Sequence, residues 1–420
     1  MNSRERIKSA LSHKQPDKLP VDFGGMLATG MHVSIVYKLR QKFGLDKPLT
    51  PVKVIEPYQM LGEIADDLKE ILGVDCTSVT GKYNLFGFEN KDWKEWELYD
   101  GTPLLVPGLF NTKPQKDGSV FMYPQGDIKV PPSAKMPYKG YYFDNIIRQE
   151  KIDEDNLNIE DNLEEFKLLS DEELEFIKKV VDERYNNTEY AVIGSIVSSG
   201  FGDIALVPGP TLKNPKGIRD IAEWYISIVA RKEYVYKVFD KQCEIALENY
   251  KRINNIVGKK LDVVFVTGTD FAAQNGLFIS KELYNSLYKP FHIKVNKWIH
   301  ENTNWKSFFH SCGAIESLIE EIIDSGFDIL NPIQISCKNM DSVTLKKKYG
   351  KYITFWGGGI DTQRTLPFGT PKTVSEEVKG QIDIFNNDGG YIFSSVHNIQ
   401  ANTPIENIFA LIEVIHKYRE

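Results

Sequence analysis

Eight short apolar segments, most of them separated by amphipathic stretches, constrain the fold of this 420-residue chain more than any other feature. The apolar segments are residues 19–23, 74–79, 190–194, 261–266, 307–310, 327–330, 352–356 and 391–394. The helical patterns between them include residues 65–72, 281–300, 315–324, 374–386 and 404–417. Strands that alternate with helices indicate a parallel sheet, and eight of them predict closure into an α/β fold of the (β/α)8 TIM-barrel type. We expect residues 1–420 to form a single domain of this kind.

One region interrupts the alternation of strands and helices. Residues 81–162 are rich in aromatic residues, glycine and proline, and the segments 99–103, 116–119 and 124–127 have the composition of hairpin turns. We therefore expect a β-rich insertion over 81–162, in an early βα loop of the barrel. It is either a stabilising flap or a wall over the functional site. Its aromatic residues either line a substrate pocket or form a small core of their own: Tyr83, Phe86, Phe88, Trp93, Trp96 and Tyr99.

Composition excludes several classes of function. The net charge is −7 with both signs scattered along the chain, and the absence of a basic block argues against a nucleic-acid partner. No apolar run reaches the length of a membrane span, and the first residues are too polar for a secretory signal. Four irregularly spaced cysteines are typical of a reducing compartment. We expect a cytoplasmic protein without membrane partners.

Polar residues follow most of the predicted strands. In a TIM barrel, the residues at the carboxyl ends of the strands converge on one active site. Asp361 and Asp270 are the candidate catalytic residues, although each could equally cap the segment that follows it. Gln334 and Asp22 are the candidate substrate-binding residues at the same end of the barrel.

A metal site is predicted by His310, which ends the fifth apolar segment, and by Cys312, two residues further on. Residues i and i+2 of a strand point to the same side, so this pair shares one face. Imidazole and thiolate are ligands that Zn²⁺ prefers, and three protein ligands with one open position make a catalytic site. His397, after the last segment, is the candidate third ligand. The alternative for all three residues is ordinary packing in the core.

These motifs, in this order, resemble the uroporphyrinogen decarboxylase superfamily, and more closely its corrinoid-dependent methyltransferase branch. The resemblance runs over nearly the whole chain. It is carried by residues 4–11 followed by 16–21, by the turn from Gly357 to Asp361, and by residues 397–408. The fold that it implies is a distorted TIM barrel, in agreement with the count of apolar segments.

The two branches of the superfamily differ at positions that can be compared here. The decarboxylases carry an arginine-rich stretch after the first strand, which binds the carboxylates of their substrate, whereas residues 23–30 of this chain contain no arginine. The methyltransferases carry a His-x-Cys pair and a later cysteine as zinc ligands. His310 and Cys312 match the pair, and His397 stands where the later cysteine is expected.

The resemblance implies a zinc-dependent methyltransferase. It would move a methyl group between a small substrate, either a methoxy-aromatic molecule or a thiol, and the cobalt of a corrinoid protein. The cofactors implied are Zn²⁺ and a cobamide, the latter supplied by the partner corrinoid protein. Two alternatives remain from the residues alone. One is a decarboxylase of a different acid, with Asp361 and His397 handling protons, and the other is a non-catalytic ligand-binding barrel.

Overall fold

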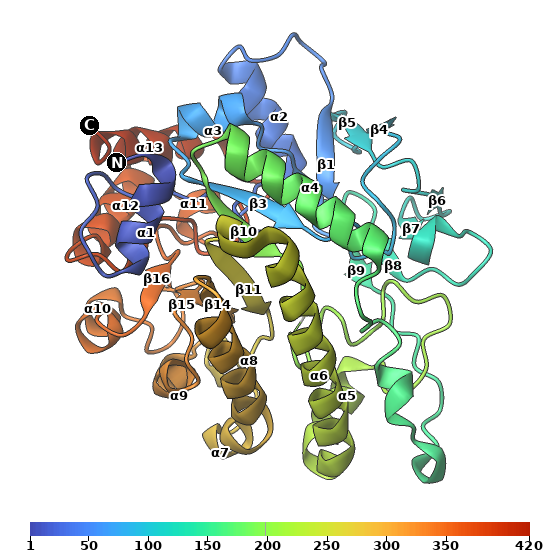
Figure 1. The fold of residues 1–420 in the computed structure, drawn as a ribbon. Coiled ribbons are helices and arrows are strands. Elements are labelled where there is room, and N and C mark those ends of the chain that lie inside the picture. The colour runs from blue at the N-terminus through green and yellow to red at the C-terminus, as the bar shows by residue number, and fades with distance from the viewer. Residues whose placement is uncertain (198) are drawn as a thin grey trace.

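A parallel sheet, surrounded by helices, forms the centre of the computed structural model, which describes residues 1–197 and 199–420 (Figure 1). Over the described residues this sheet has seven strands, and each pairs with its neighbours in chain order. The strands are β3 (Cys76–Thr80), β10 (Ala191–Ser195), β11 (Val263–Thr267), β14 (Lys306–His310), β15 (Ile329–Asn331), β16 (Thr354–Trp356) and β17 (Tyr391–Ile392). A curled parallel sheet with consecutive strands adjacent is a TIM-barrel-like fold, which confirms the predicted fold class.

The first predicted strand, 19–23, is reduced to a bridge between the two edges of this sheet. Val21 pairs in parallel with Phe393, and the N–H of Asp22 donates to the carbonyl of Phe393 at 2.8 Å. On the other side, the N–H of Asp75 donates to the carbonyl of Val21 at 2.8 Å. Pro20 has no N–H to contribute to a longer ladder. The eight apolar segments thus correspond to seven strands and one bridging segment.

Side chains along each strand point alternately to the inside of the barrel and to the layer between the sheet and the helices. On β14, Phe308 packs inside with Trp356, whereas Phe309 packs outside against Phe327. Helix α1 (Ser3–Leu11) places Ile7 and other apolar side chains in the same inner cluster. The barrel interior is therefore a packed core, and His310, two residues after Phe308, lies on its inner face.

Helices cover the outside of the sheet (Figure 1). Helix α13 shows why they pack there, since Ile408, Leu411, Ile412 and Ile415 form an apolar stripe at helical spacing and are buried. The predicted helix 281–300 is divided by a π-helical turn, Tyr284–Tyr288. In the parts of the chain that the structure covers, no helix is both long and apolar enough to cross a membrane. The helices are α2 (Val33–Lys42), α3 (Asp66–Leu72), α4 (Asp171–Asn187), α5 (Ile221–Ala230), α6 (Lys232–Val257), α7 (Lys281–Leu283), α8 (Lys289–Asn302), α9 (Ile319–Asp324), α10 (Ser342–Tyr349), α11 (Thr365–Phe368), α12 (Pro371–Phe385) and α13 (Ile405–Lys417).

Two small sheets lie to one side of the barrel (Figure 1). The first contains β1 (Val52–Glu56), β2 (Leu61–Gly62), β4 (Lys94–Glu97) and β5 (Pro103–Val106). The second contains β6 (Thr112–Pro114), β7 (Val120–Met122), β8 (Ala134–Met136) and β9 (Asp144–Asn145). Strands β4 and β5 pair antiparallel, as do β6 and β7, around two of the turns indicated by the sequence. Strands β1 and β2, which precede residue 81, were not predicted from the sequence.

The aromatic residues of this region divide between a core and a surface. Phe86 and Phe88 are fully buried and pack with Phe110 and Phe143. Tyr83 is half exposed and faces a cavity described below. The interpretation as a small core therefore holds for Phe86 and Phe88, whereas a role of the aromatic residues in substrate binding stays a prediction.

A third short hairpin rises from the barrel mouth, with strands β12 (Ala272–Ala273) and β13 (Gly276–Leu277). It follows β11 directly and contributes Ala272 and Ala273 to the wall of the cavity at the mouth.

Candidate metal centre and its cavities

His310 and Cys312 lie at the carboxyl end of β14, as the strand period predicts. His310 is the last residue of the strand and points into the mouth of the barrel, where its ring lies 6.4 Å from that of Phe265. Its Nε2 atom lies 3.7 Å from Sγ of Cys312. That separation is close to the distance between two ligands that share a tetrahedral zinc ion, since Zn–N and Zn–S bonds are about 2.0–2.3 Å long.

Asn331, at the end of the neighbouring strand β15, fixes the tautomer of His310. The amide Nδ2 of Asn331 donates to the carbonyl of Trp356 at 2.7 Å, so its Oδ1 must be the acceptor towards the imidazole. Oδ1 lies 2.6 Å from Nδ1 of His310, which therefore carries the proton. Nε2 is left with its lone pair facing Cys312. Metal-binding histidines in proteins are oriented by this kind of hydrogen bond.

The backbone after His310 is held by two of the predicted site residues. Asp270 accepts a hydrogen bond from the N–H of Cys312 at 2.7 Å, and Gln334 accepts one from the N–H of Gly313 at 2.7 Å. Gly313 has φ +99°, and a Cβ there would lie 2.4 Å from the carbonyl oxygen of Ala272. Only glycine fits this position. The loop therefore presents the Cys312 side chain in one orientation.

His397 reaches the same point from the segment after β17. Its ring and that of His310 lie 5.6 Å apart at an angle of 66°. The next residue, Asn398, accepts a hydrogen bond from the N–H of Gly30 at 2.6 Å and donates to Oε1 of Gln59 at 2.8 Å. One ligand atom from each of His310, Cys312 and His397 lies within 4.8 Å of the other two. Strands far apart in sequence thus bring the three predicted ligands together.

The electrostatics around these residues suit a bound cation. Burial, with the charge of Asp270 and the neighbouring Cys337 thiol, raises the pKa of the Cys312 thiol well above its ordinary value. Burial, reinforced by His310, lowers the pKa of His397 to about 3, which keeps its ring neutral and available as a ligand. A thiolate at Cys312 needs a positive charge beside it, which a divalent metal ion supplies.

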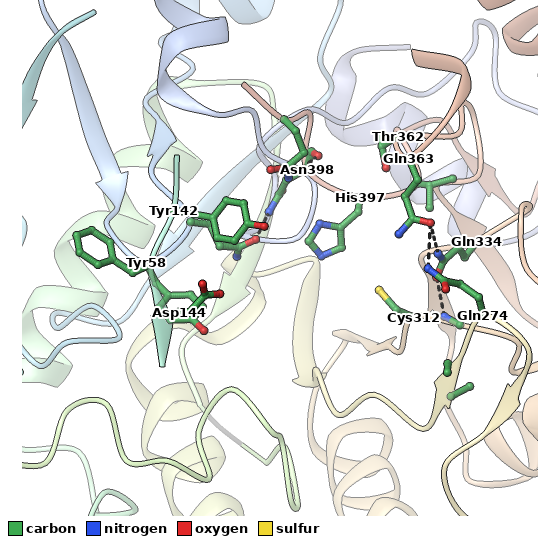
Figure 2. A pocket seen from close by; sticks show the side chains of 17 residues that line it. Tyr58, Tyr142, Asp144, Gln274, Cys312, Gln334, Thr362, Gln363, His397 and Asn398 are labelled. Atoms are coloured by element: carbon green, nitrogen blue, oxygen red, sulfur yellow. Dashed lines mark hydrogen bonds between the residues drawn. The ribbon is translucent and has the colours of Figure 1, made fainter. Parts of the chain in front are cut away.

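A cavity of about 590 Å³ opens onto Cys312 and His397 (Figure 2). On one side stand Gln274, Gln334 and Gln363, where the side-chain amides of Gln274 and Gln334 both donate to Oε1 of Gln363. Figure 2 shows Tyr58, Tyr142 and Asp144 on the other side, the last two from the segment 81–162. The volume is that of an ordinary small-molecule site. We refer to this space as the metal-side cavity.

Comparison with known proteins identifies the family. The family model described as uroporphyrinogen decarboxylase (URO-D) matches residues 135–418, which is more than half of the chain. The chain belongs to the URO-D family.

Among solved structures, the fold of this URO-D family member is similar to that of a methyltransferase from Methanosarcina mazei. The TM-score is 0.55 at 14% sequence identity, and the match covers 100% of each chain. At this identity the likeness establishes the fold alone. No curated protein matches the sequence.

A second cavity of about 410 Å³ adjoins the first in this URO-D barrel, and the two share Tyr58 and Gln59 in their walls. It lies over the carboxyl ends of β3, β10 and β11 and is lined mainly by apolar side chains. Three acidic residues also line it: Glu56, Glu165 and Asp203. Burial raises the pKa of the Glu56 and Asp203 carboxyl groups to about 7, and the charge of Asp270 adds to the rise at Asp203. We refer to this space as the apolar cavity.

Asp22 and Asp361 lie outside the lining of both cavities. Asp22 is fully buried inside the barrel, where it accepts hydrogen bonds from N–H of Gly25 at 2.6 Å and from Nε1 of Trp356 at 2.8 Å. Burial raises the pKa of Asp22 to about 6. Asp361 accepts a hydrogen bond from N–H of Gln363 at 2.8 Å, so it holds the turn that presents Gln363. Their roles in substrate binding and catalysis stay predictions.

Sequence reasoning missed Asn331, Glu56 and Asp203. Asn331 directly follows the sixth apolar segment and ends β15, so the strand-end rule that gave His310 would also have found it. Asp203 lies in a loop between β10 and α5, where no periodic pattern points to a position. Glu56 ends a strand of the side sheet, which was not anticipated.

Proposed function

We propose that this URO-D family member is a zinc-dependent methyltransferase that moves a methyl group between a small molecule and the cobalt of a partner corrinoid protein. The observation that supports this most directly is the convergence of His310, Cys312 and His397 at the barrel mouth, where Cys312 and His397 line a cavity. The methyltransferase from Methanosarcina mazei, which has a similar fold, is consistent with the proposal.

The residues present fit a zinc ion. Two imidazoles and one thiolate form a normal ligand set for a catalytic site with one open position, and that position would face the cavity. Bound zinc would act there as a Lewis acid that polarises the oxygen or sulfur atom to which the methyl group is attached or transferred. Asn331 keeps the lone pair of His310 on Nε2, and Asp270 fixes the backbone of Cys312. The glutamines at the rim offer amide groups that can orient a polar substrate.

The decarboxylase alternative gains less support. Asp361, one of its two candidate proton-handling groups beside His397, is engaged with the backbone of Gln363 and does not line the cavity. In the described part of the chain, neither cavity is lined by a lysine or an arginine, so a polycarboxylate substrate would lack counter-charges. We therefore keep methyl transfer as the proposed reaction.

The experiment that tests the proposal is a metal analysis joined to a methyl-transfer assay. The purified full-length protein should contain about one zinc per chain, and the double variant His310→Ala/Cys312→Ala should contain almost none. The zinc-loaded parent should then demethylate a methoxylated donor, or methylate a thiol, in the presence of a reduced or methylated cobamide, and the variant should not. Absence of zinc from the parent after reconstitution would refute the zinc site. Zinc binding without any cobamide-dependent turnover would refute the reaction.

A further inference from the structure

Amide side chains dominate the wall of the metal-side cavity. Six of its lining residues carry one, in two hydrogen-bonded groups: Gln274, Gln334 and Gln363 form the first, and Gln59, Asn398 and Gln400 form the second. Within the described residues, Asp144 is the only carboxylate in the lining, and no lysine or arginine contributes to it. A cavity of this composition offers hydrogen bonds without a cationic counter-charge, so it suits a neutral polar ligand.

The orientation of Gln334 is fixed by the backbone. Its Oε1 accepts a hydrogen bond from N–H of Gly313 at 2.7 Å, and an amide nitrogen turned to that place would meet another N–H. Its Nε2 therefore faces Gln363, where its two N–H groups make one long bond of 3.4 Å. The side chain is only 5% exposed. Gln334 thus keeps an N–H group for a ligand, on the wall that also carries the metal ligand Cys312.

The other two glutamines of this group are oriented in turn. Because Nε2 of Gln334 can only donate, Gln363 presents its Oε1 there, and the same oxygen accepts from Nε2 of Gln274 at 3.2 Å. In Figure 2 the nitrogen of Gln363 points away from both glutamines, towards the side of the cavity where His397 lies. Over the part of the chain that the structure describes, neither Nε2 of Gln363 nor Oε1 of Gln274 bonds another protein group. The wall therefore presents a donor beside an acceptor.

A carboxamide complements this wall. Its carbonyl oxygen can accept from the N–H groups of Gln363 and Gln334, while its own N–H donates to Oε1 of Gln274. A carboxylate has two acceptors, so one of them would face the oxygen of Gln274, and the lining holds no cation to compensate. A ketone fills the carbonyl position but leaves Gln274 without a donor. Sites that pair donors with acceptors discriminate against ligands that leave one of these groups unbonded.

We propose that the wall formed by Gln274, Gln334 and Gln363 binds a neutral carboxamide group of the small molecule whose oxygen or sulfur atom occupies the open position of the metal. This inference rests on the methyltransferase function proposed above and names a chemical class for its small substrate. Gln363 and Gln274 are the residues that determine specificity. Gln334 connects them to the metal centre, because its amide group also holds the backbone directly after Cys312.

The test is direct binding of three thiols that share one skeleton: mercaptopropionamide, the methyl ketone in which a methyl group replaces its amide nitrogen, and mercaptopropionate. A second series with one more methylene group covers the reach from the metal to the wall. The probes are titrated by calorimetry into the zinc-loaded full chain. In at least one series the amide should have the lowest Kd, with the ketone about fivefold weaker and the carboxylate about tenfold weaker or more.

Two variants assign the contacts and a third is their control. Gln274→Met removes the acceptor and should bring the Kd values of amide and ketone within about twofold of each other. Gln363→Glu keeps an oxygen for the N–H groups of Gln274 and Gln334 but replaces the free donor, so the amide should bind about tenfold more weakly at unchanged zinc content. Gln400→Met changes the second group, where Gln400 donates to the carbonyl of Asn398, and should leave the preference for the amide within about twofold of the parent.

The outcomes separate this inference from the proposed function. Equal or tighter binding of the ketone or the carboxylate in both series, or a preference for the amide that survives Gln274→Met, would overturn the inference and leave the proposed function standing. Loss of the preference in Gln400→Met would place the amide on the other group of side chains and would also overturn it. Absence of thiol binding to the zinc-loaded protein would refute the open metal position, and with it both the inference and the proposed function.

Discussion

Replacing Asp203 with asparagine should stabilise the protein above neutral pH. Asparagine keeps an oxygen for the N–H of Ala205 and places an uncharged amide where the second carboxyl oxygen faces the cavity. In the folded state burial raises the pKa of Asp203 from 3.8 to about 7. Between these two pH values the folded chain holds a proton that the unfolded chain has released, so the stability of the parent falls as pH rises through this window. The variant lacks this penalty.

The magnitude follows from the size of the shift. About three pKa units correspond to a ceiling of roughly 4 kcal/mol, since one unit is about 1.4 kcal/mol. Asp203 is partly exposed, so we halve the figure to about 2 kcal/mol above pH ~7, decreasing to nothing near pH ~4. For a chain of 420 residues an advantage of this size raises the melting temperature by only about 2 °C, so denaturant titration is the better assay.

The assay compares urea unfolding of the parent and Asp203→Asn at several pH values between about 4 and 8.5. The dependence of the unfolding free energy on urea concentration should be the same for both proteins. Asp144→Asn is the matched control, and we expect its stability to stay within about 0.5 kcal/mol of the parent throughout. A stability difference for Asp203→Asn that is constant with pH, or that destabilises at every pH, would refute the reasoning.

Three further predictions concern the metal centre. Cys312→Ser should reduce zinc from about one per chain to a trace by elemental analysis, with the far-UV circular dichroism of the parent retained. Asn331→Ala leaves the ring of His310 without its partner, so competition with a chelator should show zinc affinity lower by about 10–100-fold; an unchanged affinity would mean that Asn331 does not orient the ligand. Gly313→Ala should destabilise the protein by about 2 kcal/mol or more in urea, because its Cβ meets the carbonyl of Ala272 at 2.4 Å. Gly276→Ala, in the nearby hairpin with no atom within 4 Å of its Cβ, is the control and should change stability by less than about 1 kcal/mol.

Strand periodicity and the order of apolar segments allowed most of the barrel to be predicted. The pairing of His310 with Cys312 followed from the two-residue period, and His397 from its place after the last segment. The rule that polar residues at strand ends converge was reliable for these three. It did not distinguish the candidate metal ligands from side chains that hold the backbone beside them, such as Asp270 and Gln334.

The features that could not be predicted from the sequence depend on contacts between distant segments. Asp203 lies in a long loop whose path is fixed by tertiary packing, so its approach to Gly268 has no local signal. Glu56 ends β1, a strand whose first residues pair with β5 about fifty residues further along the chain. The segment around Val21 was predicted to be a strand but forms only an isolated bridge. A short apolar segment has the same composition in both cases, so the sequence does not distinguish them.

The bridge between Val21 and Phe393 has a consequence for how the chain is made. The two edges of the barrel can be joined only after a ribosome has synthesised the chain as far as Phe393, more than 370 residues after Val21. His397 emerges later still, so the nascent chain carries His310 and Cys312 without their third partner. Contacts between residues so far apart in sequence slow folding and leave intermediates exposed. We expect that nascent chains acquire metal only after His397 has been synthesised, and that truncation before Phe393 yields an open sheet with an unprotected thiol.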